Sequence, residues 1–149
     1  MVQVLFPRNA YAKHLTCLKN SCAFCTEGGE LLIKRFQYWD WIYSKFPYRK
    51  FHTLLIPKRH ITRFEELQTE ELFELSSILK EVEHRYIDAH IVSEDSVYGD
   101  QMYFCWRSRF VPKEKKSVEH FHLHICPKFE IQQGIILEDD AWDIEIGVL

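Results

Sequence analysis

The spacing of apolar and polar residues divides the first part of the chain into short strand-like runs and one long helical run. Residues 30–43 are rich in bulky and β-branched side chains and are interrupted near residues 35–37, which predicts a β-hairpin. Residues 51–57 predict a further strand that ends at its proline. Apolar residues then recur at intervals of three and four over residues 69–90, which predicts an amphipathic helix with Thr69 as its N-cap. The stripe expected to face the core consists of Leu72, Leu75, Leu79, Val82 and Tyr86, widened by Phe73, Ile78 and Ile87.

The second half of the chain alternates in the manner of β-strands. Residues 98–110 are aromatic and strand-like, with Arg107 and Arg109 on one face. A charged loop is predicted over residues 111–116, and residues 118–126 predict a last strand. One long helix set against mainly antiparallel strands predicts an α+β fold with a sheet of about five strands.

Length and composition restrict the class of protein. A chain of 149 residues predicts a single domain, here divided into an N-terminal segment (1–29), a core (30–128) and a tail (129–149). The net charge of −3, with no run of five like charges, argues against a nucleic-acid duplex as partner. No apolar run approaches the roughly 18 residues that cross a bilayer, and the odd number of five cysteines argues against a secreted disulfide framework. We therefore expect a cytoplasmic protein that does not bind membranes.

Three histidines alternate with apolar residues in the last predicted strand. His120, His122 and His124 should share one face of the strand, because successive side chains point to opposite faces. Three packed imidazoles repel one another when protonated, so such a face needs polar partners, a pocket or a metal. One histidine could attack an electrophile while its neighbours bind the developing charge, or the histidines could bind a catalytic Zn²⁺. A polar face without catalytic function is the remaining alternative.

The cysteines offer a second candidate site. Cys22 and Cys25 form a Cys-x₂-Cys pair, which lacks the βαβ context of a thioredoxin-type redox motif and needs two further ligands to hold a structural zinc. Two free thiols in a loop are the alternative, and Cys17 could replace Cys22 in a different register. Cys105 and Cys126 fall on predicted strands, so we expect both to be buried.

Two segments resemble the hallmarks of one family. Ser117 to Lys128 reads Ser-Val-Glu-His-Phe-His-Leu-His-Ile-Cys-Pro-Lys, which resembles the signature of the histidine triad (HIT) superfamily. Residues 52–60 read His-Thr-Leu-Leu-Ile-Pro-Lys-Arg-His, which resembles the second hallmark segment of that family. The segments occur in the family's order with the predicted helix between them, and the match covers about residues 22–128. The resemblance implies a HIT-like fold, paired across a homodimer.

The resemblance also implies a function. HIT proteins are typically nucleotide hydrolases or nucleotidyl transferases that act at the α-phosphate of substrates such as phosphoramidates and dinucleoside polyphosphates, which makes a purine-type nucleotide the expected small-molecule partner. By resemblance, His122 would attack phosphorus to give a nucleotidyl-histidine intermediate, and His124 would bind the phosphate and help to protonate the leaving group. His52 would close the pocket and Ser117 would contact a phosphoryl oxygen. A nucleotide-binding or scaffold module with little turnover is the alternative.

A zinc site follows from the same resemblance. Family members with the Cys-x₂-Cys pair imply a Cys₂His₂ set made of Cys22, Cys25, His60 and His120, which would hold one structural Zn²⁺ per chain. The galactose-1-phosphate uridylyltransferases are a weaker resemblance, because they usually show His-Pro-His without the third histidine.

The sequence departs from the family pattern in two places. Phe51 stands where the family usually has glycine, so a close backbone approach at this point is expected to be lost. Residues 102–109 contain neither the asparagine nor the glycines found in relatives. Arg107 and Arg109 are candidates for phosphate contacts in their place, and a solvated strand face is the alternative for both. These departures affect the expected substrate more than the expected reaction.

Overall fold

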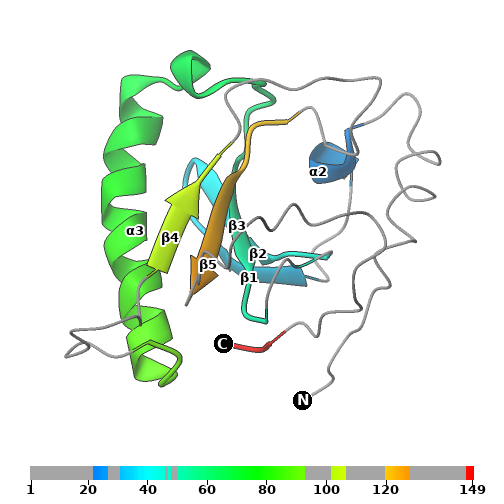
Figure 1. The fold of residues 1–149 in the computed structure, drawn as a ribbon. Coiled ribbons are helices and arrows are strands. Elements are labelled where there is room, and N and C mark those ends of the chain that lie inside the picture. Colours follow the sequence, from blue (N-terminus) through cyan, green and yellow to red (C-terminus); the bar gives the residue numbers. More distant parts are fainter. Residues whose placement is uncertain are drawn as a thin grey trace, which may run out of the picture.

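The apolar runs of the sequence become a five-stranded antiparallel sheet covered on one face by a single long helix (Figure 1). The computed structural model describes residues 22–26, 31–45, 47, 50–92, 102–106, 120–127 and 147–149. The strands, in the sheet order β1-β2-β3-β5-β4, are β1 (Leu32–Arg35), β2 (Trp39–Tyr43), β3 (Thr53–Pro57), β5 (Leu123–Pro127) and β4 (Met102–Cys105). The helices are α2 (Ala23–Thr26), α3 (Thr69–Asp88) and the short 3₁₀ helix η2 (Phe64–Glu66). The predicted α+β class and the sheet of about five strands are confirmed.

The N-terminal hairpin forms as the sequence predicts. β1 and β2 pair antiparallel, with Arg35 opposite Asp40, and the chain turns between them over residues 36–38. β3 begins at Thr53, two residues later than predicted. Phe51 causes this delay, because its φ of 68° lies in the left-handed region, which interrupts the extended backbone.

The long helix α3 follows the prediction except at its first turn. Gln68, rather than Thr69, is the N-cap, and it forms a capping box in which its backbone N–H donates to the Glu71 carboxylate at 2.8 Å. The predicted core positions Leu72 and Phe73 are wrong, since their exposed fractions are 39% and 78%. Glu71 occupies the buried face instead, and the side chains that line that face are Glu71, Leu75, Ile78, Val82 and Tyr86.

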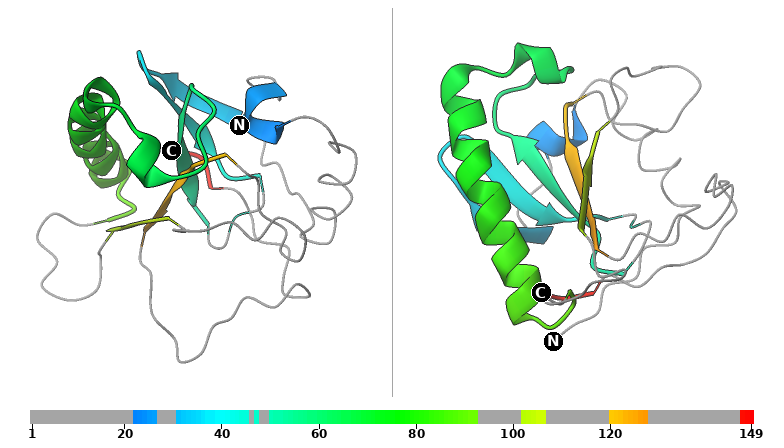
Figure 2. Two further views of the ribbon diagram at one scale, coloured as in Figure 1. Left: turned by 90° about the horizontal axis from the view of Figure 1, so that it is seen from above. Right: turned by 60° about the vertical axis from the view of Figure 1, so that its left-hand side comes forward.

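The hydrophobic core lies between α3 and one face of the sheet. The residues that alternate with the three histidines, Phe121, Leu123 and Ile125, are buried in this core. Figures 1 and 2 show α3 and the short helix α2 on opposite sides of the sheet. Cys126 is buried as predicted, whereas Cys105 is exposed near the end of the edge strand β4. In the described part of the chain, no helix is long and apolar enough to cross a membrane.

Candidate active site and metal-binding cluster

The three histidines before and within β5 keep the alternation expected of a strand, although the regular strand begins only at Leu123. His120, His122 and His124 are all buried, and their apolar neighbours occupy the core on the other face. The rings of His122 and His124 meet edge to face, with 4.7 Å between their centroids. The sheet therefore carries buried imidazoles on the face that is turned away from α3.

A backbone hydrogen bond fixes the proton of His122. Its Nδ1 lies 2.8 Å from the carbonyl oxygen of His120. A carbonyl oxygen only accepts hydrogen bonds, so Nδ1 must carry the hydrogen. In the neutral ring Nε2 then holds the lone pair, which is the form that an attacking imidazole needs.

His52, directly before β3, and His124 on β5 form a second contact. The pairing of β3 with β5 places Leu54 opposite His124, which brings His52 to the same face. His52 Nε2 lies 2.9 Å from His124 Nδ1, and the two rings stack with 5.1 Å between centroids. One of these nitrogens must donate to the other. His52, His122 and His124 are called here the buried histidine group.

Four potential metal ligands converge beside this group. Cys22, Cys25, His60 and His120 offer ligand atoms that all lie within 4.8 Å of one another, and they are called here the Cys/His cluster. His120 Nδ1 lies 3.3 Å from Cys22 Sγ and 3.4 Å from Cys25 Sγ. His60 Nδ1 lies 3.4 Å from Cys25 Sγ. This cluster could hold a metal ion.

Three of the spacings within the cluster fit a tetrahedral zinc ion. Zn–S and Zn–N bonds of about 2.3 and 2.0 Å at a tetrahedral angle place sulfur and nitrogen about 3.5 Å apart. The three sulfur–nitrogen distances of 3.3 to 3.4 Å agree with that value. Partial burial raises the pKa of the Cys25 thiol, and neighbouring Cys22 raises it further. A bound cation would counter this rise, because it favours the thiolate form of Cys25.

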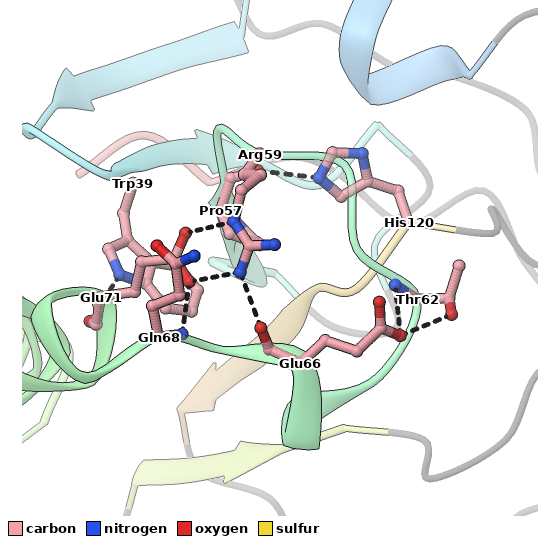
Figure 3. Close-up of polar contacts among 8 residues, drawn as sticks. All are labelled: Trp39, Pro57, Arg59, Thr62, Glu66, Gln68, Glu71 and His120. Atoms are coloured by element: carbon pink, nitrogen blue, oxygen red, sulfur yellow. Dashed lines mark hydrogen bonds and ion pairs between the residues drawn. The ribbon is translucent and has the colours of Figure 1, made fainter.

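His120 is prepared for metal binding by its other ring nitrogen. Nε2 lies 2.8 Å from the carbonyl oxygen of Pro57 and must donate to it (Figure 3). In the neutral ring, Nδ1 therefore faces the cysteines with its lone pair. Burial lowers the pKa of His120 to about 4, with a further lowering by His60 and His122. The ring is consequently neutral at physiological pH, as a metal ligand must be.

The loop that carries His60 is tied to the start of α3. The Arg59 guanidinium donates to both carboxylate oxygens of Glu71, at 3.0 and 2.9 Å, and to the carbonyl oxygen of Glu66 (Figure 3). This pairing lowers the pKa of Glu71 and raises that of Arg59. A bidentate pair has little angular freedom, so it restrains the backbone directly before His60.

Sequence reasoning did not assign several residues around the site. Phe24 packs its ring edge against His122, at 5.2 Å between centroids, and against His120 at 5.9 Å. Its position between the two cysteines was the available signal. Arg59 and Glu71 were also missed, although Glu71 lies at a core-facing spacing from Leu75 and Ile78, and a buried carboxylate requires a partner.

The predicted site residues fall into three sets. The buried histidine group comes together, and so does the four-residue Cys/His cluster. His120 belongs to the Cys/His cluster through its ring, and its carbonyl oxygen accepts a hydrogen bond from His122 of the buried histidine group. Ser117, Arg107 and Arg109 lie outside the described residues.

Comparisons with known proteins agree with this architecture. Among curated proteins, an uncharacterized HIT-like protein of Mycoplasma genitalium is 30% identical over 95 residues, which cover 60% of this chain and only 57% of that protein. A solved histidine triad nucleotide-binding protein of Candida albicans is similar with a TM-score of 0.59 and 20% identity, over 74% of this chain and 76% of that chain. A Zn-bound histidine triad family protein of Mycobacterium smegmatis is similar with a TM-score of 0.54 and 20% identity, over 79% and 80% of the two chains.

These structural likenesses establish the fold. A model of the HIT domain matches residues 30–131, which is more than half of the chain and includes both hallmark segments. On this match and on the arrangement of its histidines, the chain belongs to the histidine triad (HIT) family.

Proposed function

We propose that this protein is a nucleotide hydrolase or nucleotidyl transferase that acts at an α-phosphate through a covalent intermediate on His122. The observation that carries the proposal is the hydrogen bond from His122 Nδ1 to the His120 carbonyl, at 2.8 Å. In the neutral ring it leaves the Nε2 lone pair as the nucleophile and fixes the direction in which the ring presents it.

In the first step, His122 Nε2 attacks the α-phosphorus of a nucleoside phosphoramidate or dinucleoside polyphosphate. A nitrogen–phosphorus bond forms, the bond from phosphorus to the leaving group breaks, and the leaving group takes a proton. Neighbouring imidazoles counter the charge that spreads over the phosphoryl oxygens.

His124 is the candidate proton donor, and His52 supports it. His124 can give up a proton readily only as an imidazolium, in which Nδ1–H donates to His52 Nε2 across the 2.9 Å contact and Nε2–H remains for the leaving group. With this arrangement His124 Nε2–H protonates the leaving group. In the second step water attacks phosphorus and gives its proton to His124, the nitrogen–phosphorus bond breaks, and a nucleoside monophosphate leaves with His122 regenerated.

We also propose that the Cys/His cluster binds one structural Zn²⁺ per chain. The fit of the sulfur–nitrogen distances to a tetrahedron and the orientation of His120 support this assignment. The ion would supply a cross-link between α2 and the segment that leads into β5. With α2 held in this way, its residue Phe24 would stay packed against His122.

The proposal also includes three further substrate contacts and an oligomeric state. Ser117, Arg107 and Arg109 would contact phosphoryl oxygens of a purine-type nucleotide. A homodimer is proposed as well, and β4 forms one edge of the five-stranded sheet, which is where a second copy could add strands. Light scattering on the purified full chain measures that state directly.

The test is the release of AMP from adenosine 5′-phosphoramidate by the wild type, His122→Ala and the matched control His84→Ala. His84 is exposed on α3, far in sequence from both hallmark segments, so its variant should retain wild-type turnover. Mass spectrometry of an alkaline-quenched reaction should show one nucleotidyl group on the peptide that contains His122. Equal release by all three proteins would refute the role of His122. Tight nucleotide binding by the wild type without release would instead indicate a binding module.

A further inference from the structure

Phe51, the residue before His52, adopts a backbone conformation that normally requires glycine. Its φ of 68° is left-handed, and among the described residues only His90 shares a positive φ without being glycine. His90 follows the C-cap of α3, where a left-handed residue is a common way to end a helix. Phe51 closes the turn that leads into β3, where a left-handed residue is usually glycine, so contacts from elsewhere must offset the cost that its Cβ adds.

A directed chain of hydrogen bonds ends on the Phe51 carbonyl. The Tyr86 hydroxyl donates to that oxygen at 2.5 Å, which uses its one hydrogen. The Thr53 hydroxyl, 2.9 Å away, must therefore donate to the Tyr86 oxygen. Trp41 Nε1–H in turn donates to Thr53 Oγ1 at 2.9 Å. Every donor in the chain has a defined direction, and each bond polarises the next.

The three side chains of this hydrogen-bond series are buried and come from three different elements. Trp41 lies on β2, Thr53 on β3 and Tyr86 on α3, and their exposed fractions are 2%, 0% and 0%. Burial raises the pKa of Tyr86, so its hydroxyl stays protonated and remains a donor. Loss of one hydrogen-bond partner in this buried position would leave a polar atom unsatisfied. The hydrogen-bonded conformation is therefore strongly preferred over conformations that break one of these bonds.

The ring of Phe51 is held as well. A Cβ atom at Gly147 would come within 2.2 Å of this ring, so glycine is needed there for the two segments to pack. The Lys50 ammonium lies 5.4 Å from the centroid of the same ring. These contacts explain why a large side chain is tolerated at position 51, but they leave the direction of its carbonyl to Tyr86.

The Phe51 carbonyl belongs to the peptide group that leads into His52. Rotation of that group would displace the His52 backbone and its ring. The carbonyl of His52 is itself bound by the Ser44 N–H at 3.1 Å, and its ring contacts His124. We propose that Tyr86 is a positioning residue, which holds the left-handed peptide at Phe51 so that His52 reaches His124. The catalytic consequence of this inference rests on the proposed function, whereas the structural consequence does not.

The first test reads the histidine contact without any substrate. In ¹⁵N-labelled full-length protein, ring ¹⁵N–¹H correlation spectra identify which nitrogens of His52 and His124 carry hydrogen and whether the shared hydrogen is protected from exchange. Tyr86→Phe should lose that protected signal, whereas Tyr38→Phe should keep it. Tyr38 is a matched control because its hydroxyl accepts from the exposed Gln37 side chain and lies outside the chain of bonds to Phe51. An unchanged signal in folded Tyr86→Phe would overturn the proposal.

The second test is kinetic. Misplacing a catalytic group by a fraction of an ångström should lower kcat of Tyr86→Phe about tenfold, with KM changed less than about twofold. Thr53→Val, which removes the donor to Tyr86 but leaves the bond from Tyr86 to Phe51, should lower kcat less. Thr53→Val also provides a second test of the proposal if Tyr86→Phe folds poorly.

A rescue experiment separates positioning from simple packing. Glycine adopts the left-handed conformation without strain, so Phe51→Gly should reduce the need for Tyr86. The loss of kcat caused by Tyr86→Phe should then be much smaller in the Phe51→Gly background than in the wild type. Equal losses in both backgrounds would overturn the proposal. If wild-type protein releases no nucleotide, the proposed function fails, and the spectra still decide whether Tyr86 positions His52.

Discussion

The Cys/His cluster and the buried histidine group lie side by side on one face of the sheet but are assembled in different ways. All four candidate ligands of the cluster come from segments outside the strands, and Cys25 and His60 are exposed. The buried histidine group is placed by strand pairing and by a backbone carbonyl, with its members hidden from solvent. The cluster could thus hold a metal ion, whereas contacts within the protein orient the buried histidine group.

His120 is the residue that the two regions share. Its ring faces the cysteines, while its carbonyl accepts from His122. One residue thus faces the Cys/His cluster with its side chain and orients His122 with its backbone. Substitution of the ring should therefore affect the cluster, and substitution at His122 should affect catalysis alone.

The largest effect should separate these two histidines. His122→Ala should lower turnover by about 10³-fold or more, since it removes the nucleophile, while the metal content stays at the wild-type value. His120→Ala should lose the metal. Elemental analysis and turnover of the two purified variants measure both properties. Equal metal loss in the two variants would show that the regions are not separate.

A smaller effect should follow from removing the exposed ligand His60. His60→Ala should weaken metal affinity at least about 100-fold, which at fixed metal concentration corresponds to about 5–10 °C in Tm. Chelation of the wild-type protein should lower its Tm as well, and His84→Ala should behave as wild type in both conditions. Thermal unfolding with and without chelator measures these shifts. A chelator that abolishes turnover while Tm stays constant would argue for a catalytic metal instead.

Removal of the Arg59–Glu71 ion pair that supports the His60 loop should have a moderate effect. Glu71→Gln removes the charge that Arg59 binds bidentately, so it should lower the free energy of unfolding by about 2 kcal/mol and weaken metal affinity about tenfold. Glu83→Gln makes the same change at an exposed position of the same helix and should change neither property. Denaturant unfolding and metal titration measure the two effects. Unchanged metal affinity in Glu71→Gln would remove the link between this ion pair and His60.

The smallest effect concerns pH. The pKa of His120 is lowered to about 4 from an ordinary value near 6.5, so between these values the unfolded chain binds more protons than the folded protein. In metal-free protein the stability from this group is complete above about pH 6.5 and is lost as the pH falls toward 4. After allowance for solvent screening the loss is on the order of 1 kcal/mol. Urea unfolding across this range should show it, and a His120→Gln variant should show a flatter profile.

Local pattern alone determined much of this molecule. The hairpin, the long helix and the separation of histidines from core residues before β5 all follow from side-chain periodicity, which depends only on neighbours in sequence. The Cys-x₂-Cys pair likewise identified half of a metal site. These features required no knowledge of how distant segments meet.

Only the tertiary structure decided which partner each polar group found. The contact between His52 and His124 joins residues 72 positions apart and depends on the register of β3 against β5. The same holds for the burial of Glu71 in place of Leu72, which depends on Arg59 reaching it from another element. Phe51 shows most clearly what the local sequence cannot predict, since residues 51–57 predict an extended strand. The left-handed backbone at that residue is supported by the Tyr86 hydroxyl and by the packing at Gly147, both of which the fold brings to it.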